Sequence, residues 1–230
     1  MILSHEFKFI FLKTTKTAGT SVEIALSRFC GPRDIITPIS PQDEKIRSEL
    51  GYRGPQNYLV PLHQNKLPGW ARLILKGERK KKYFNHISAE EVKSSMDPDD
   101  WNNYFKFCIE RNPWDRLISY YYWRCRSEPR PSVAEFLAST EPALLRHKGY
   151  DLYTINDQVA VDRICRFEHL ETDMEAVRQQ IGLPEKLELP RAKSGFRRDK
   201  RSYRDILNEP DREKIAEMFQ KEIDLLGYVY

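Results

Sequence analysis

Residues 7–26 read FKFIFLKTTKTAGTSVEIAL, and this stretch decides the fold. The apolar run at 7–12, rich in Phe and Ile, is typical of a short buried strand. A polar loop at 13–19 that contains a glycine follows the strand. Thr20 then begins a helix, and Thr20 and Glu23 have the spacing of a capping box. A strand, a loop and a helix in this order open a nucleotide-binding α/β fold.

Strands and helices alternate along the rest of the chain. The pattern predicts strands at 104–109 and 163–167, with a weaker one at 58–62. It predicts helices at 42–50, from Ser88 onwards, after Asn112 and at 211–226, and these begin or end at capping residues such as Gly227. We therefore expect a single α/β domain over residues 1–230, with a mostly parallel central sheet and helices on both faces. Ligands bind such folds beyond the carboxyl ends of the strands.

The composition favours a globular enzyme that binds anions. The 230 residues are 40% hydrophobic and 31% charged, with a net charge of +4, which is too modest to indicate specific nucleic-acid binding. The four cysteines form no C-x-x-C pair, so we expect free thiols, no metal site and a cytoplasmic location. No signal peptide and no apolar stretch of about 20 residues is present, so no transmembrane segment is expected. The oligomeric state is not indicated.

The loop after the first strand has the chemistry of a phosphate cradle. A glycine lets the backbone approach an anion, the following helix presents N–H groups, and lysine and hydroxyl groups add donors. The candidate residues are Lys16, Thr17, Ala18, Gly19, Thr20 and Ser21. The loop is not a Walker A motif, because the lysine precedes the glycine by three positions. The alternative is an ordinary turn between a strand and a helix.

The segment RNPWDRLIS at 111–119 forms a second candidate site. Arg111 lies at a strand end and Ser119 two turns into the next helix, so the guanidinium and the hydroxyl are both directed towards one helix face. Together they suit a monoester phosphate. The alternative is that Asn112 merely caps a helix and Arg116 is solvated, which accounts for neither Arg111 nor Ser119.

The segments TTKTAGTS (14–21) and FCIERNPWDRLISYYYW (107–123) together resemble the two donor-binding motifs of sulfotransferases that use 3′-phosphoadenosine 5′-phosphosulfate (PAPS). The resemblance is closest to the branch of carbohydrate and membrane-associated sulfotransferases and their bacterial relatives. It implies a P-loop-like fold, with residues 16–21 on the 5′-phosphosulfate and with Arg111 and Ser119 on the 3′-phosphate. It also implies 3′-phosphoadenosine 5′-phosphate (PAP) as product, no required metal, and a hydroxylated small molecule or glycan as acceptor. Thr15 and Glu110 depart from the usual pattern.

Sulfuryl transfer to a hydroxyl needs a general base, and His86 is the best candidate among five histidines. It lies just before the helix that begins at Ser88, where the helix dipole disfavours imidazolium, and its surroundings resemble the catalytic-histidine region of the family. Lys16 would stabilise the leaving phosphate. The alternatives are that His86 only bridges the loop, or that His63 is the base.

A basic loop at 185–203 is expected to close over the nucleotide, and the resemblance favours Lys193 and Ser194 there. Two other function classes stay open. One is a P-loop-type kinase, which needs a Gly-Lys-Ser/Thr ending and an acidic Mg²⁺ ligand. The other is a non-catalytic module that binds nucleotides or nucleic acid through its basic clusters and tyrosines.

Overall fold

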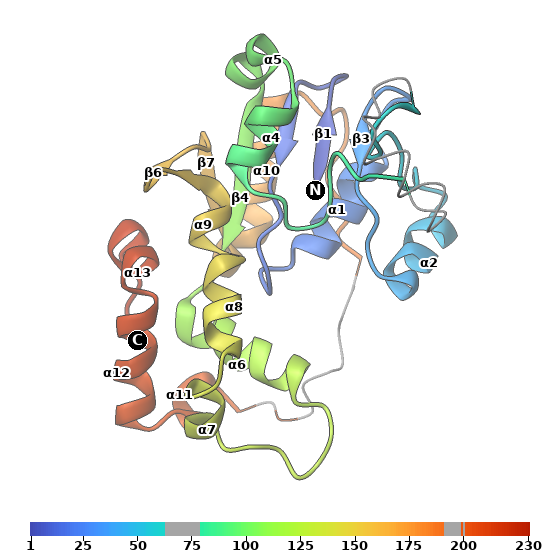
Figure 1. The fold of residues 1–230 in the computed structure, drawn as a ribbon. Helices are drawn as coiled ribbons and strands as arrows, with labels where there is room; N and C mark the ends of the chain where they lie inside the picture. The colour runs from blue at the N-terminus through green and yellow to red at the C-terminus, as the bar shows by residue number, and fades with distance from the viewer. Residues whose placement is uncertain (63–78, 191–198, 200) are drawn as a thin grey trace.

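The computed structural model describes residues 1–62, 79–190, 199 and 201–230. Within these residues a five-stranded sheet has the order β3-β1-β2-β4-β7 (Figure 1). Its strands are β1 (Ile2–Ser4), β2 (Phe9–Phe11), β3 (Ile35–Ile36), β4 (Phe105–Glu110) and β7 (Arg163–Arg166). β2, β4 and β7 pair in parallel, whereas β1 is antiparallel to both β2 and β3. Four strands therefore run in one direction and β1 in the other, so the sheet is mixed rather than purely parallel.

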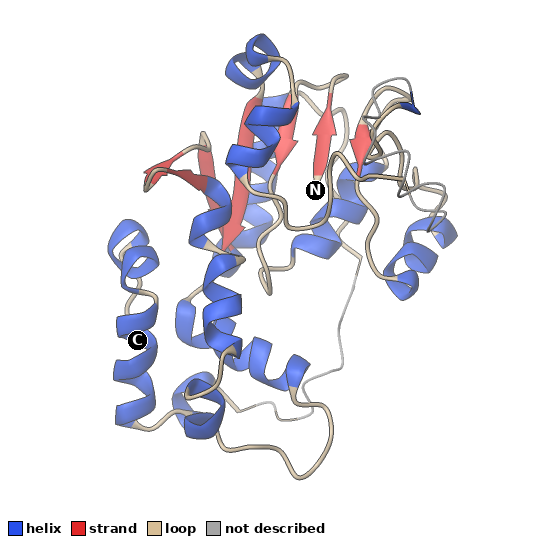
Figure 2. Ribbon diagram, in the orientation of Figure 1, coloured by secondary structure: helices blue, strands red, loops and turns tan. Residues whose placement is uncertain are grey.

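Helices cover both faces of the sheet, as expected (Figures 1 and 2). The helices of the first two thirds are α1 (Gly19–Ser27), α2 (Pro41–Glu49), α4 (Ala89–Ser95), α5 (Pro98–Asn103), α6 (Pro113–Arg124), α7 (Val133–Leu137), α8 (Glu141–His147) and α9 (Tyr150–Tyr153). A hairpin of β5 (Thr154–Ile155) and β6 (Gln158–Val159) follows, and the later helices are η2 (Phe167–His169), α10 (Leu170–Ile181), α11 (Tyr203–Ile206), α12 (Glu209–Met218) and α13 (Gln220–Leu226). None of the helices in the described part of the chain is long and apolar enough to cross a membrane.

Three apolar clusters hold these layers together. Side chains of α1 and α10 pack on one face of the sheet, around Phe11 and Phe107. Side chains of α4, α5 and α9 pack on the other face, around Ile10 and Cys108. A third cluster lies beyond the sheet and joins α6 to α7, α8 and the C-terminal helices. Burial on both faces explains why β2 and β4 are almost continuously apolar.

The parallel strands place three loops at one edge of the sheet. β2 is paired with β4 in register, Phe11 opposite Phe107, and β4 with β7, Glu110 opposite Arg166. The carboxyl ends of these strands therefore lie side by side, and residues 12–18, Arg111 and Phe167 leave from them. This edge is where a doubly wound sheet binds its ligands.

Local patterns predicted some helix ends correctly and others wrongly. The capping box of Ser88 and Glu91 is present, and Asn112 caps α6 with Pro113 in the first turn. The expected box of Thr20 and Glu23 is wrong, because α1 begins at Gly19 without a side-chain cap and Glu23 is buried in an ion pair.

Three other differences concern the extent of elements. The segment 58–62 makes only an isolated bridge between Leu59 and Lys81 instead of a strand. The predicted helix 211–226 is divided at Phe219 into α12 and α13, although it does end at Gly227. β1 was not expected, because it is only three residues long and has only two apolar residues.

Candidate functional site

A pocket of about 260 Å³ lies at the carboxyl edge of the sheet and takes residues from four parts of the chain. Its lining comes from the loop after β2 and the start of α1, from the segment before α4, from the end of β4 with α6, and from the end of β7. The residues are Lys13, Thr14, Thr15, Lys16, Thr17, Ala18, Gly19, Thr20, Ser21, His86, Arg111, Ser119, Trp123 and Phe167. The predicted donor-binding residues of both motifs and His86 are thus together in one place.

The first loop has an unusual backbone conformation that leads directly into α1. Lys16 and Ala18 have positive φ angles of 67° and 63°, which are unusual for residues with a side chain. α1 begins directly after Ala18, a residue whose side chain makes no capping hydrogen bond to the first N–H groups. The first four N–H groups of a helix have no partner within the helix, so this end of α1 suits an anionic ligand.

Gly19 is required by close packing beneath the loop. A Cβ at Gly19 would lie 2.8 Å from Cγ of Lys13. Lys13 cannot easily move away, because its Nζ lies 2.8 Å from Glu23 Oε2 and both side chains are almost fully buried. Burial raises the pKa of Glu23, but the positive charges of Lys13, the N-terminal ammonium and Arg47 together outweigh that effect, and the pKa falls to about 2. Lys13 therefore lines the pocket but is held in place by Glu23 beneath the loop.

The second loop holds Arg111 in a fixed orientation. Its Nε and one terminal nitrogen donate to Asp115 Oδ2 at 2.9 and 2.6 Å, and the guanidinium stacks on Phe167 at 4.0 Å from the ring centre. Its other terminal nitrogen donates to the carbonyl of Lys16 at 3.2 Å, which connects the two loops directly. Ser119 lies one turn beyond Asp115 on α6 and lines the same pocket.

His86 lies in the segment before α4, which packs on the face of the sheet opposite to α1. Its φ is 59°, and its Nδ1 lies 2.7 Å from the carbonyl oxygen of Lys13. A carbonyl only accepts, so Nδ1 carries the proton and donates, and Nε2 is left as the basic nitrogen of the neutral ring.

The neutral state of His86 was expected, but for a different reason. Burial, followed by the positive charge of Lys13, lowers the pKa of His86 to about 3. The expectation rested instead on the N-terminus of α4, whose N-cap is Ser88 as predicted. His86 also bridges to the first loop, so the bridging role and the proposed role as a base are compatible.

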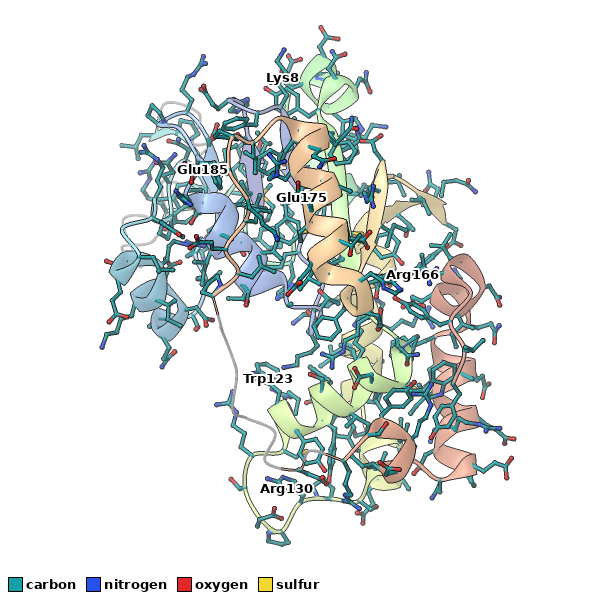
Figure 3. The ribbon with its side chains drawn as sticks, turned by 180° about the vertical axis from the view of Figure 1, so that it is seen from behind. Lys8, Trp123, Arg130, Arg166, Glu175 and Glu185 are labelled. Atoms are coloured by element: carbon teal, nitrogen blue, oxygen red, sulfur yellow. The ribbon has the colours of Figure 1, made fainter. Side chains whose placement is uncertain are left out.

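Two aromatic residues at the pocket were not identified from the sequence. Trp123 stands at the end of α6, four residues after Ser119, and the Nζ of Lys16 lies 5.7 Å from its ring centre (Figure 3). Phe167 follows β7 and stacks on Arg111. The available signals were the i, i+4 spacing from Ser119 and the position of Phe167 after a third parallel strand.

Lys193, Ser194 and His63 lie outside the described residues. In the part of the chain that the structure covers, no group of three or more His, Cys, Asp or Glu side chains is arranged to hold a metal ion. The four cysteines are free, and Cys30, Cys108 and Cys165 are buried.

Comparison with known proteins identifies a family for this chain. Residues 1–151, well over half of the chain, match the profile of the sulfotransferase family. A curated relative, an uncharacterized protein of Archaeoglobus fulgidus, is 36% identical over 94 residues, which cover 39% of this chain and 77% of the relative.

Proposed function

This chain belongs to the sulfotransferase family, and from that premise we propose that it is a PAPS-dependent enzyme that transfers a sulfuryl group to a hydroxylated acceptor. The acceptor would be a small molecule or a glycan, and PAP would be the second product. We propose further that residues 1–230 act as one P-loop-like nucleotide-binding domain. The observation that carries the proposal is the single pocket that joins the loop at 13–21 with Arg111, Ser119 and His86.

The donor side of the proposal needs two anion sites at a fixed spacing. The N–H groups at the start of α1, the hydroxyls of Thr20 and Ser21, and the Lys16 ammonium suit the 5′-phosphosulfate. Arg111 and Ser119 suit the 3′-phosphate, because a planar guanidinium and a hydroxyl can both donate to one phosphate. The bond from Arg111 to the Lys16 carbonyl supports this assignment, because it ties the two anion sites to each other.

The chemical step is an in-line displacement at sulfur. The acceptor oxygen bonds to sulfur, the bond from sulfur to the 5′-phosphate oxygen breaks, and the electron pair stays on PAP. Lys16 would stabilise the charge that develops on the leaving oxygen. Nε2 of His86 would take the hydroxyl proton, and the negative charge of the donor would raise the basicity of the ring towards the range that general-base catalysis requires.

Nucleotide binding by calorimetry without magnesium tests the proposal. We expect PAP to bind more tightly than 5′-AMP, and Arg111→Ala to weaken PAP binding by about 10- to 100-fold, the loss of one or two charge-assisted hydrogen bonds. Arg163→Ala is the matched control, because Arg163 also pairs with an aspartate, Asp173 at 2.9 Å, but does not line the pocket. Magnesium-dependent binding of ATP that equals or exceeds that of PAP would reject the proposal in favour of a kinase.

A further inference from the structure

Arg116 lies beneath the donor-binding loops and is not solvated. Its side chain is 1% exposed, and NH1 donates to Glu110 Oε2 at 3.1 Å, where the carboxylate is fully buried. The sequence-based alternative that treated Arg116 as a surface residue of α6 is therefore wrong. A buried guanidinium needs partners on every nitrogen, so its contacts define what it does.

The three nitrogen positions of Arg116 bond to three different segments. Nε donates to the carbonyl of Thr15 at 2.9 Å, directly before Lys16. NH1 holds Glu110, and NH2 donates to the carbonyls of Leu145 and Lys148 at 3.3 and 3.0 Å. The N–H of Thr15 donates to the same carbonyl of Lys148 at 2.9 Å. Thr15 is thus fixed on both sides, and the start of the anion-binding loop is tied to α6 and to the end of α8.

The surroundings of Arg116 are shaped for a guanidinium. A Cβ on Gly149 would lie 2.4 Å from each of its terminal nitrogens, so only glycine leaves room for the side chain. On the other side, Glu222 of α13 approaches NH1 at 4.0 Å and is 2% exposed. Among the described residues, Glu222 Oε1 and the buried hydroxyl of Tyr153 make no hydrogen bond. α13 therefore contributes a buried carboxyl group to the surroundings of Arg116.

We infer that Arg116 is a positioning residue that sets the distance between the two anion sites of the donor pocket. It belongs to α6, the helix that carries Ser119 and starts beside Arg111, and through Thr15 it holds the loop that carries Lys16. This inference rests on one part of the proposed function, namely that the ligand carries a phosphate group at each of two ends. A lysine carries its three donors on a single nitrogen, whereas the planar fork of arginine presents donors from three nitrogens towards separate segments.

The test displaces the guanidinium without removing its charge. Gly149→Ala introduces the clashing Cβ, and Gly54→Ala is its control, because a Cβ there has no neighbour within 4 Å. Arg116→Lys is a second variant in case Gly149→Ala does not fold. Its control is Arg178→Lys on α10, where Arg178 likewise bonds to a carboxylate, that of Glu175 (Figure 3), and to the carbonyl of Leu183.

Two readouts separate positioning from general stability. The first is the ratio of the dissociation constants of 5′-AMP and PAP, which measures how well both ends bind together. We expect this ratio to fall at least about tenfold in Gly149→Ala and Arg116→Lys, because misplaced sites lose the advantage of simultaneous binding. A variant that is only less stable has a lower melting temperature, but its folded molecules keep the wild-type ratio of the two dissociation constants. The second readout is amide hydrogen exchange of residues 14–20 without ligand, which should become faster in these variants than in their controls.

An unchanged ratio together with unchanged exchange at 14–20 in the folded variants would overturn the inference and leave the proposed function intact. Absence of PAP binding in the wild-type protein would instead reject the proposed function. The exchange measurement then decides by itself whether Arg116 holds the loop.

Discussion

The state of His86 makes a quantitative prediction about stability and pH. In the folded protein, burial and the nearby Lys13 ammonium lower the pKa of His86 from 6.5 to about 3. In the unfolded chain the imidazole has its ordinary pKa. The unfolded state therefore binds more protons than the folded state between these values, and the free energy of unfolding must fall as the pH falls from 6.5 towards 3.

The size of the effect follows from the shift in the pKa. About 3.5 pKa units correspond to a total loss of about 5 kcal/mol at 1.36 kcal/mol per unit. Between pH 7 and pH 5 the loss from this one residue is about 2 kcal/mol, a large share of the stability of an ordinary domain. Stability from this group is fully present above pH 6.5.

Urea unfolding of the wild type and of His86→Asn at pH 7 and pH 5 isolates this contribution. Asparagine accepts the φ of 59°, its amide can donate to the Lys13 carbonyl as Nδ1 does, and it does not titrate. We expect the wild type to lose about 2 kcal/mol more than the variant between the two pH values. His147→Asn, which removes a histidine whose side chain is 69% exposed, is the control. Equal losses in the wild type and His86→Asn would refute the assignment of a buried, neutral ring.

Three further variants test other parts of the structure by urea unfolding. Ala18→Gly should stabilise the protein by up to about 1 kcal/mol, because Ala18 has a φ of 63°, and a destabilised variant would contradict the strained turn. Burial and the nearby Glu110 raise the pKa of Glu222 to about 7, so the folded state holds a proton that the unfolded state releases, and stability falls as the pH rises from 4.5 to 7. Glu222→Gln should therefore be about 3 kcal/mol more stable than the wild type at pH 8 but equal to it at pH 4, whereas a constant difference would speak against the titration. Asn112→Ala should cost about 1 kcal/mol, since Asn112 accepts from two N–H groups at the start of α6, and an unchanged stability would show that the cap is dispensable.

Much of the pocket was predicted from local sequence patterns. The strand–loop–helix order around residues 7–26 and around Arg111 places both loops at the ends of adjacent parallel strands, and the structure has this arrangement. Such a prediction succeeds because the direction of parallel strands fixes the edge from which every following loop leaves. The cap at Asn112 was equally local and correct. The roles assigned to these residues remain predictions.

The sequence-based predictions were wrong or incomplete where contacts with distant residues determine the local structure. Thr20 and Glu23 have capping-box spacing, but Glu23 gains more from the buried ammonium of Lys13, ten positions earlier, than from a backbone N–H. Trp123 and Phe167 have no motif of their own, and only the folded chain brings them to one pocket. Phe219, where the helix breaks, is fully buried in the cluster around α6, a contact that the local sequence does not reveal.

The pair of Glu110 and Arg116 shows how a departure from a pattern can carry information. A buried ion pair gains little net stability, because removing both charges from water costs several kcal/mol per ion and the attraction only returns about that amount. Two apolar side chains could fill the same volume, but they could not donate to the carbonyls of Thr15, Leu145 and Lys148. Glu110, an acidic residue at the end of a mostly apolar strand, is the counter-charge that allows an arginine to lie under the loop that carries Lys16. The two residues are six positions apart in the sequence, but one ends β4 and the other lies in α6. Their contact therefore depends on how α6 is oriented relative to β4.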